Sequence, residues 1–318
     1  MPNLRRLVLL SLLSLLTALP PTAIAQKPAS TLRIGYQKSS TLLTVLKLRG
    51  QLEQDLAPLG VKISWHEFSS GLPLLEALNV GGVDLSADVA DTVPVFAQAA
   101  GAQLTYFAQE APSPSAQAIV VRADAPYKTV ADLKGKKIAV TKAAGSHYLL
   151  IAALEKAGLR FKDIEPAYLT PADGRAAFER GSVAAWVTWD PFLAGVQRQS
   201  DIRILADGRN VADYQRYYLA STAYAAARPD VLAVVFEALS KTGKWVKQSP
   251  KEAAELLAPA WGLDAKTVEL ANSRRSYDVR AVVKEALGEQ QKIADAFFGE
   301  GLLPRKLDAT AVPLWRKN

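Results

Sequence analysis

Two stretches of the sequence recur in the same order, about one hundred residues apart. Ile34–Lys38 resembles Ile138–Lys142, because each is a short apolar strand followed by a lysine, small residues and a helix. Ala77–Asp84 resembles Ala177–Ala184 at nearly the same offset. One match of this length would be noise, but two matches in order indicate two similar lobes. We therefore predict an α/β protein in which each lobe is a strand–helix–strand–helix–strand unit.

The second repeat contains a small-residue turn between a strand and a helix. The strand Ile138–Val140 is followed by Ala143–Ser146, and a helix then runs to about Ala157. The first N–H groups of a helix have no partner within it, and with the helix dipole they can hold a carboxylate, phosphate or sulfonate. The turn is therefore a candidate anion site. The alternative is an ordinary strand–turn–helix connection of an α/β fold.

If the two lobes face each other, a ligand binds between them at the carboxyl ends of their strands. The donors expected to line this cleft come from both lobes: Gln37, Ser39 and Ser40 from the first, and Gly145, Ser146 and His147 from the second. Several neutral donors around one pocket suit an anion with many acceptor oxygens. Binding of this kind needs no buried ion pair and avoids its desolvation cost.

Two further segments follow strands at the same predicted edge. In the first lobe, Asp91 and Thr92 can either cap a helix or contact the ligand. In the second lobe, Trp189, Asp190 and Pro191 take the corresponding place. We expect Asp190 to cap the helix that Pro191 begins. Trp189 either lies flat against an alkyl chain or belongs to the core.

The remaining strands and helices suggest how the chain is divided. The strand expected over Tyr214–Ala220 returns the chain to the first lobe, and the pattern from Pro229 onward is helical and packs on that lobe. Crossovers near Gln109–Gln117 and Tyr217–Tyr224 would then form a hinge. The expected division is a signal peptide, 1–25; a first lobe, 26–113 plus 222–318; and a second lobe, 114–221.

The N-terminus has the pattern of a secretory signal peptide. Arg5 and Arg6 precede the apolar run Leu7–Leu19, which is short for a membrane span, and Ala23–Ala25 then forms an A-x-A cleavage site. Cleavage after Ala25 would release a soluble protein, the alternative being an uncleaved anchor. The chain has no Cys, which suits an oxidising compartment, and we expect the periplasm.

The composition argues against catalysis and against nucleic-acid binding. There is no Cys, and the 2 His, His66 and His147, are far apart, so neither a zinc site nor a cofactor is expected. No G-x-S-x-G, P-loop or H-E-x-x-H motif is present. The formal net charge is +7, but the sequence has no basic run with interleaved aromatic residues. Nucleic acid is therefore not an expected partner. The charge instead favours small anionic ligands.

Five motifs together resemble the aliphatic sulfonate-binding proteins of ABC importers: Ile34–Lys38, Glu76–Gly81, Phe96–Gly101, Tyr168–Asp173 and Trp189–Phe192. The wider taurine- and nitrate-binding relatives share a looser version, and the resemblance covers nearly the whole mature chain. It implies a type II periplasmic binding fold, in which two α/β lobes joined by two crossover strands close on a ligand in the cleft. It also implies delivery of a sulfonate to a membrane permease driven by an ATPase, for use as a sulfur source.

The resemblance further places the sulfonate head at Ala144–His147, with help from Gln37 and the loop of Asp91 and Thr92. The segment Asp88–Pro94 is one residue longer than the family pattern, so we expect the loop near the ligand tail to be reshaped.

The ligand class remains open at this point among sulfonates, taurine, a sulfate ester, nitrate and other oxyanions. Taurine would call for a carboxylate near its ammonium group, and Asp91 or Asp190 could serve. Outside the binding class, the alternative is an enzyme on the same scaffold, such as a pyrimidine-precursor synthase. The signal peptide and the shortage of His and Cys argue against that alternative. We expect a monomer.

Overall fold

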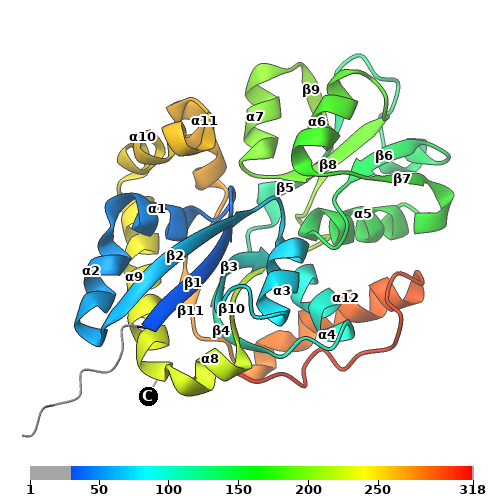
Figure 1. The fold of residues 1–318 in the computed structure, drawn as a ribbon. Coiled ribbons are helices and arrows are strands. Elements are labelled where there is room, and N and C mark those ends of the chain that lie inside the picture. The colour runs from blue at the N-terminus through cyan, green and yellow to red at the C-terminus, as the bar shows by residue number, and fades with distance from the viewer. Residues whose placement is uncertain (1–29, 317–318) are drawn as a thin grey trace, which may run out of the picture.

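The computed structural model describes residues 30–316, which form two α/β lobes (Figure 1). The expected signal peptide, 1–25, lies outside the described residues. Among the helices of residues 30–316, none combines the length and the apolar character needed to cross a bilayer.

The first lobe is built around a six-stranded sheet in residues 30–316, with the order β11-β4-β10-β3-β1-β2. Its strands are β1 (Ser30–Gln37), β2 (Val61–Phe68), β3 (Leu85–Ala90), β4 (Leu104–Glu110), β10 (Arg216–Ser221) and β11 (Val279–Arg280). The helices connected to these strands are α1 (Thr41–Arg49), α2 (Gln51–Leu56), α3 (Gly71–Asn79), α4 (Thr92–Ala99), α8 (Thr222–Ala227), α9 (Pro229–Gln248), α10 (Pro250–Trp261), α11 (Ala265–Ser273) and α12 (Gly288–Gly299).

The second lobe has a five-stranded sheet in the described residues, with the order β7-β6-β8-β5-β9. Its strands are β5 (Gln117–Arg122), β6 (Lys137–Val140), β7 (Glu165–Tyr168), β8 (Ala185–Trp189) and β9 (Ile202–Asp207). Its helices are α5 (Gly145–Lys156), α6 (Pro171–Glu179) and α7 (Phe192–Gln199).

The predicted repeat is confirmed in the pairing of the two sheets. β1 lies between β2 and β3 and is parallel to both, just as β6 lies between β7 and β8. The matched residues Ile34 and Ile138 pair with Leu85 and Ala185, respectively. In each lobe an antiparallel strand follows, β10 beside β3 and β5 beside β8. The carboxyl ends of the equivalent strands therefore point toward the junction of the lobes.

The described chain passes between the lobes after β4 and again after β9. β10 pairs with both β3 and β4, so Arg216–Ser221 belongs to the first sheet. The expected second-lobe boundary at residue 221 and the expected crossover at Tyr217–Tyr224 are therefore too late. The second crossover lies in residues 208–215. The chain returns to the first lobe earlier than expected because Arg216–Ala220 is buried throughout and occupies an interior position of the first sheet.

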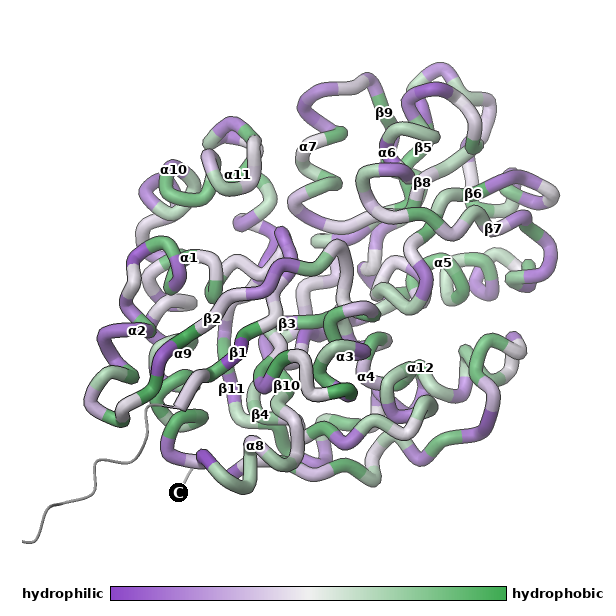
Figure 2. The backbone as a smooth tube through the Cα atoms, viewed as in Figure 1, coloured by the Kyte–Doolittle hydropathy of each residue, from purple (hydrophilic) through white to green (hydrophobic). Residues whose placement is uncertain are grey.

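Apolar residues cover both faces of each sheet, and Figure 2 shows hydrophobic segments in the interior of the first lobe, around β1 and β3. In the second lobe, α5 covers one face, and α6 and α7 cover the other. The core beneath α5 also includes Val95 of α4 and Phe297 of α12, so the lobes share an apolar contact. The C-terminal helices pack on the first lobe as expected, and α12 contacts α5 of the second lobe as well as α4.

Helix α9 approaches the segment after α11 very closely. A Cβ on Gly243 would lie 2.1 Å from the carbonyl oxygen of Tyr277, so a glycine is required at this contact. Tyr277 itself has a φ of 51°, in the left-handed region that non-glycine residues seldom adopt. This close packing places the neighbouring Arg275 in the interior of the first lobe, where it is 3% exposed.

We predict that Gly243→Ala lowers the free energy of unfolding by about 1–3 kcal/mol or more, because the added methyl group meets backbone. Urea unfolding followed by circular dichroism measures the change. Gly288→Ala is the matched control, since a Cβ at Gly288 would have nothing within 4 Å. Equal stabilities of the two variants would show that α9 can shift away from Tyr277 at little cost.

Candidate functional site

A small cavity lies where the carboxyl ends of β1, β3 and β8 meet the N-terminus of α5, and its volume is about 10 Å³. It is lined by Gln37, Gly71, Ala90, Val93, Ala144, Gly145, Trp189, Tyr214 and Arg216. Both lobes and the second crossover contribute to this lining. This is the position at which open α/β sheets bind ligands, and it is the junction to which the sequence repeat pointed.

Three of the residues predicted for the site line this cavity, namely Gln37, Gly145 and Trp189. The Gln37 side chain is oriented by a 3.1 Å hydrogen bond from Nε2 to the carbonyl oxygen of Asp88. Trp189 is 5% exposed and packs edge-on against Phe192, with ring centroids 5.7 Å apart. Trp189 therefore belongs to the apolar core and also forms a wall of the cavity.

The start of α5 keeps donors that no other group uses. The Ala144 N–H donates to the carbonyl of Thr141, and the His147 N–H donates to that of Ala144. No hydrogen bond of the described residues uses the N–H of Gly145 or Ser146. The Ser146 hydroxyl is buried and also lacks a partner in the structure. Unpaired buried polar groups are rare, and at a helix N-terminus they are the donors that an anion requires.

The imidazole of His147 lies away from the cavity lining. It packs between aromatic rings, at centroid distances of 5.5 Å from Tyr168 and 5.0 Å from Phe297. Burial lowers the pKa of His147 to about 3, with a contribution from the charge of Lys142. The neutral ring accepts a 3.3 Å hydrogen bond from the Ala143 N–H at Nδ1. His147 thus fixes the turn before α5 and brings no positive charge to the cleft.

Ser39 and Ser40 form hydrogen bonds with two residues of the cavity wall. The Ser40 hydroxyl oxygen accepts a hydrogen bond from the Gln37 N–H at 3.1 Å. The Ser39 hydroxyl oxygen accepts one from Nη2 of Arg216 at 3.2 Å. Both serines are buried, so they hold Gln37 and Arg216 in place.

Arg216 is a charged cavity residue that the sequence analysis did not predict. It is the first residue of β10 and is 2% exposed. Its Nε donates to Oδ2 of Asp88 at 2.5 Å, and its Nη1 donates to the hydroxyl of Tyr214 at 2.7 Å. A signal was present in the sequence, because an arginine within an otherwise apolar strand is buried only with a carboxylate partner. The cleft therefore contains a cation, contrary to the expectation of neutral donors alone.

A second buried arginine completes a network of four charges. Nη2 of Arg275 lies 3.0 Å from Oδ2 of Asp88 and 2.6 Å from Oε2 of Glu110. Glu110 also accepts a 2.7 Å hydrogen bond from the hydroxyl of Tyr218. Each of the four charged side chains, including that of Arg216, is no more than 3% exposed. Two cations and two anions balance, which is the condition under which such charges can be buried.

Asp91 and Thr92 connect structural elements at the edge of the cavity. Asp91 accepts from the N–H of Thr92 at 3.0 Å and from the N–H of Gln215 at 2.9 Å. Burial raises the pKa of Asp91 to about 7, although these two hydrogen bonds oppose the rise. The Thr92 hydroxyl donates to the carbonyl of Ala143 at 2.7 Å, which links α4 of the first lobe to the turn before α5.

Asp190 makes a second connection between the lobes. Its two carboxylate oxygens lie 3.0 and 3.1 Å from Nη1 of Arg274, which follows α11. Its Oδ1 also accepts from the Ala194 N–H at 2.9 Å, in the first turn of α7, whose N-cap residue is Pro191. Burial raises the pKa of Asp190 to about 7, although Arg274 opposes the rise.

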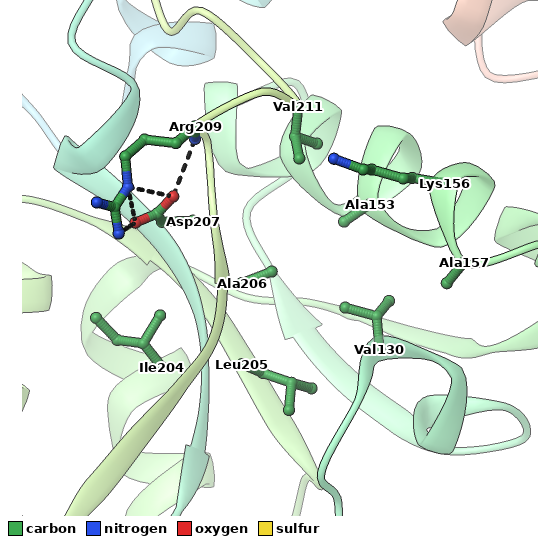
Figure 3. Close-up of a pocket in the computed structure, with 10 residues that line it drawn as sticks. All are labelled: Val130, Ala153, Lys156, Ala157, Ile204, Leu205, Ala206, Asp207, Arg209 and Val211. Atoms are coloured by element: carbon green, nitrogen blue, oxygen red, sulfur yellow. Dashed lines mark hydrogen bonds and ion pairs between the residues drawn. The ribbon is translucent and has the colours of Figure 1, made fainter.

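A larger pocket, of about 530 Å³, lies on the second lobe beside α5 and β9 (Figure 3). Its wall is mostly apolar, and two of its charged residues, Asp207 and Arg209, pair with each other. It contains none of the predicted site residues. The described residues also hold no cluster of His, Cys, Asp and Glu suited to a metal ion. The cavity between the lobes is therefore the candidate site.

We predict that Arg275→Met lowers the free energy of unfolding by about 3–5 kcal/mol, because Asp88 and Glu110 lose a cation in a buried site. Arg280→Met is the control, since the side chains of Arg280 and Asp278 are 63% and 49% exposed and such pairs contribute about 0–1 kcal/mol. Chemical denaturation of both variants tests the difference. Similar losses in the two variants would contradict a stabilising role for the buried network.

Asp190 predicts a pH dependence of stability. Its pKa in the folded protein is about 7, above the value of about 3.9 in an unfolded chain. Between these values the folded state binds more protons, so this carboxyl reduces the stability as the pH rises. Asp190→Asn should therefore become more favourable relative to wild type between pH 5 and 7, by up to about 1.4 kcal/mol per pH unit. Urea unfolding at several pH values measures this difference. Parallel pH profiles would contradict the raised pKa.

Comparisons with known proteins agree with the geometry. A family model described as "NMT1/THI5 like" matches residues 59–253. An Escherichia coli (strain K12) protein, provisionally named as an aliphatic sulfonates-binding protein, is 40% identical over 305 residues, which cover 96% of this chain and 95% of that protein.

Two solved structures show the same fold. The periplasmic aliphatic sulphonate binding protein SsuA from Escherichia coli has a TM-score of 0.81 and 41% identity, covering 90% of this chain and 97% of that one. The alkanesulfonate-binding protein SsuA from Xanthomonas axonopodis pv. citri, bound to MOPS, has a TM-score of 0.83 and 38% identity, covering 88% and 96%. These relatives confirm the expected two-lobed periplasmic binding fold, and they are solute-binding proteins. The chain belongs to the NMT1/THI5 like family and, within it, to the aliphatic sulfonate-binding proteins.

Proposed function

We propose that this protein binds an aliphatic sulfonate in the cavity between its lobes and delivers it to the permease of an ABC importer for sulfur uptake. The observation that carries the proposal is the set of unused donors at the start of α5, on Gly145 and Ser146, opposite the buried cation Arg216. The names of the relatives support the choice of ligand class.

Each part of a sulfonate has a counterpart in the site. The N–H groups of Gly145 and Ser146 and the Ser146 hydroxyl would donate to the sulfonate oxygens, and Arg216 would supply the opposite charge. Gln37 would complete the contacts from the first lobe, and Trp189 would flank the alkyl part. Hydrogen bonds to a charged group are about twice as strong as neutral ones. Micromolar affinity needs only about −8 kcal/mol, which several such bonds can provide.

The other predicted residues would act through these contacts. Ser39, Ser40 and His147 hold the groups that touch the ligand. Asp91 and Asp190 are both occupied in hydrogen bonds or ion pairs within the protein. Neither is therefore free to receive the ammonium group of taurine, which favours an unsubstituted alkanesulfonate over taurine.

The working context follows from the same proposal. The protein would be exported to the periplasm with cleavage after Ala25, act as a monomer and require no cofactor. The periplasmic relatives and the signal-peptide pattern of the N-terminus support this location.

We predict that Ser146→Ala weakens binding of ethanesulfonate by about tenfold or more, because a hydrogen bond to a charged group contributes about 1.5–3 kcal/mol. The stability without ligand should not fall, since the removed hydroxyl has no partner. Isothermal titration and thermal unfolding measure the two quantities. Thr188→Val is the matched control, because it removes another buried unpartnered hydroxyl from the same lobe. Equal affinities of Ser146→Ala and wild type would overturn the site assignment.

We also predict that alkanesulfonates raise the melting temperature more than taurine, sulfate, nitrate or a sulfate ester at equal concentration. A ligand that binds only the folded state adds about 2.7 kcal/mol of stability at one hundred times its dissociation constant. A shift with another anion but with no sulfonate would leave the binding fold intact and overturn the ligand.

A further inference from the structure

The cavity between the lobes is smaller than the ligand proposed for it. Its volume of about 10 Å³ is close to the minimum that holds one water molecule. A sulfonate group has a sulfur atom and three oxygens, and an alkyl chain follows. Binding therefore requires that at least one wall of the cavity moves.

Tyr214 is the wall best able to move. The other large lining side chains belong to regular elements, Trp189 to β8 and Arg216 to β10. Tyr214 instead lies in the second crossover, between β9 and β10. Its φ of 54° is in the left-handed region, which costs free energy for a residue other than glycine.

The contacts of Tyr214 are those that a sulfonate would make. Its hydroxyl accepts a 2.7 Å hydrogen bond from Nη1 of Arg216, whose Nε and Nη2 donate to Asp88 and Ser39. Its ring lies against the first residue of α5, because a Cβ on Gly145 would be 2.5 Å from Cε2 of the ring. Tyr214 thus covers both the cation and the helix start. Burial raises its pKa to about 12, so the group that leaves would be a neutral phenol.

We infer that the Tyr214 side chain is a placeholder for the ligand: it occupies the sulfonate position between Arg216 and Gly145, and it must swing out before a sulfonate binds. This inference rests on the proposed function. It makes Tyr214 a specificity-determining residue, because the space it vacates sets how large a ligand can be. A competing side chain also lowers the apparent affinity by the fraction of molecules in which the site is covered.

The test compares the affinity of the full mature chain for ethanesulfonate in wild type, Tyr214→Phe and Tyr214→Gly, by isothermal titration. Phenylalanine keeps the ring but frees Nη1 of Arg216, and we expect binding about threefold tighter. Glycine removes the ring and accepts the positive φ, and we expect a gain of about tenfold, as for a site that is covered in nine molecules of ten. The gain of Tyr214→Gly should be larger for the bulkier sulfonate MOPS.

Tyr277→Phe is the matched control. Tyr277 is also buried with a positive φ, and its hydroxyl is bonded to Asn272 and Thr41 rather than to Arg216. Its variant should leave the affinity unchanged.

Weaker or unchanged binding by a folded Tyr214→Phe variant would overturn the placeholder inference. Weaker binding would show that the Tyr214 hydroxyl contacts the ligand, and unchanged binding would show that it does not compete with the ligand. This variant decides the matter even if Tyr214→Gly does not fold. A gain in Tyr214→Gly no larger for MOPS than for ethanesulfonate would overturn the size limit. If wild type binds a sulfonate and Tyr214→Phe binds it more weakly, the placeholder inference fails but the proposed function stands. If neither wild type nor any variant binds a sulfonate, the proposed function fails together with the placeholder inference.

Discussion

The site depends on one buried carboxylate, that of Asp88. It receives hydrogen bonds from Arg216 and Arg275, and the carbonyl of the same residue receives one from Gln37. β1, β3, β10 and the segment after α11 are therefore joined at one point. Without this pairing an arginine could not be held at the cavity wall with almost no exposure, because the desolvation cost of an unpaired charge is several kcal/mol. The charge at the wall of the candidate site is thus a product of the core of the first lobe.

The two lobes share a topology but contribute differently to the site. Each lobe has a strand that ends at the junction, followed by a turn and by a helix that begins there. In the first lobe the Ser40 hydroxyl accepts from the Gln37 N–H, and the charged group that lines the cavity from this lobe is the guanidinium of Arg216. In the second lobe the corresponding turn leaves the N–H groups of Gly145 and Ser146 unused. The repeat therefore yields an asymmetric site, with charge on one side and unpaired backbone donors on the other. This asymmetry would give an elongated anion a preferred orientation.

The sequence was sufficient to predict the two lobes, the junction between them and the turn at Gly145, because these depend on local pattern and on the repeat. The side chains of the first lobe were harder to place. Arg216 and Asp88 are 128 residues apart, and Arg275 and Asp88 are 187 apart. Nothing local shows that such residues meet, so Arg216 was missed and the crossover was placed too late. His147 was a reasonable candidate by sequence position, but the direction of its side chain depends on α12, which supplies Phe297.

The order of the strands also bears on how the protein is assembled. The sheet of the second lobe is formed from one continuous stretch, β5 to β9, whereas the first sheet needs β10 and β11 from beyond it. A chain that is synthesised in sequence order can complete the second lobe before the sheet of the first. The edge of β3 then stays open until β10 arrives to cover it, and unpaired strand edges are where partly folded chains associate. The same interlacing means that the first lobe cannot be cut out as a contiguous fragment, because its sheet contains strands from both sides of the second lobe.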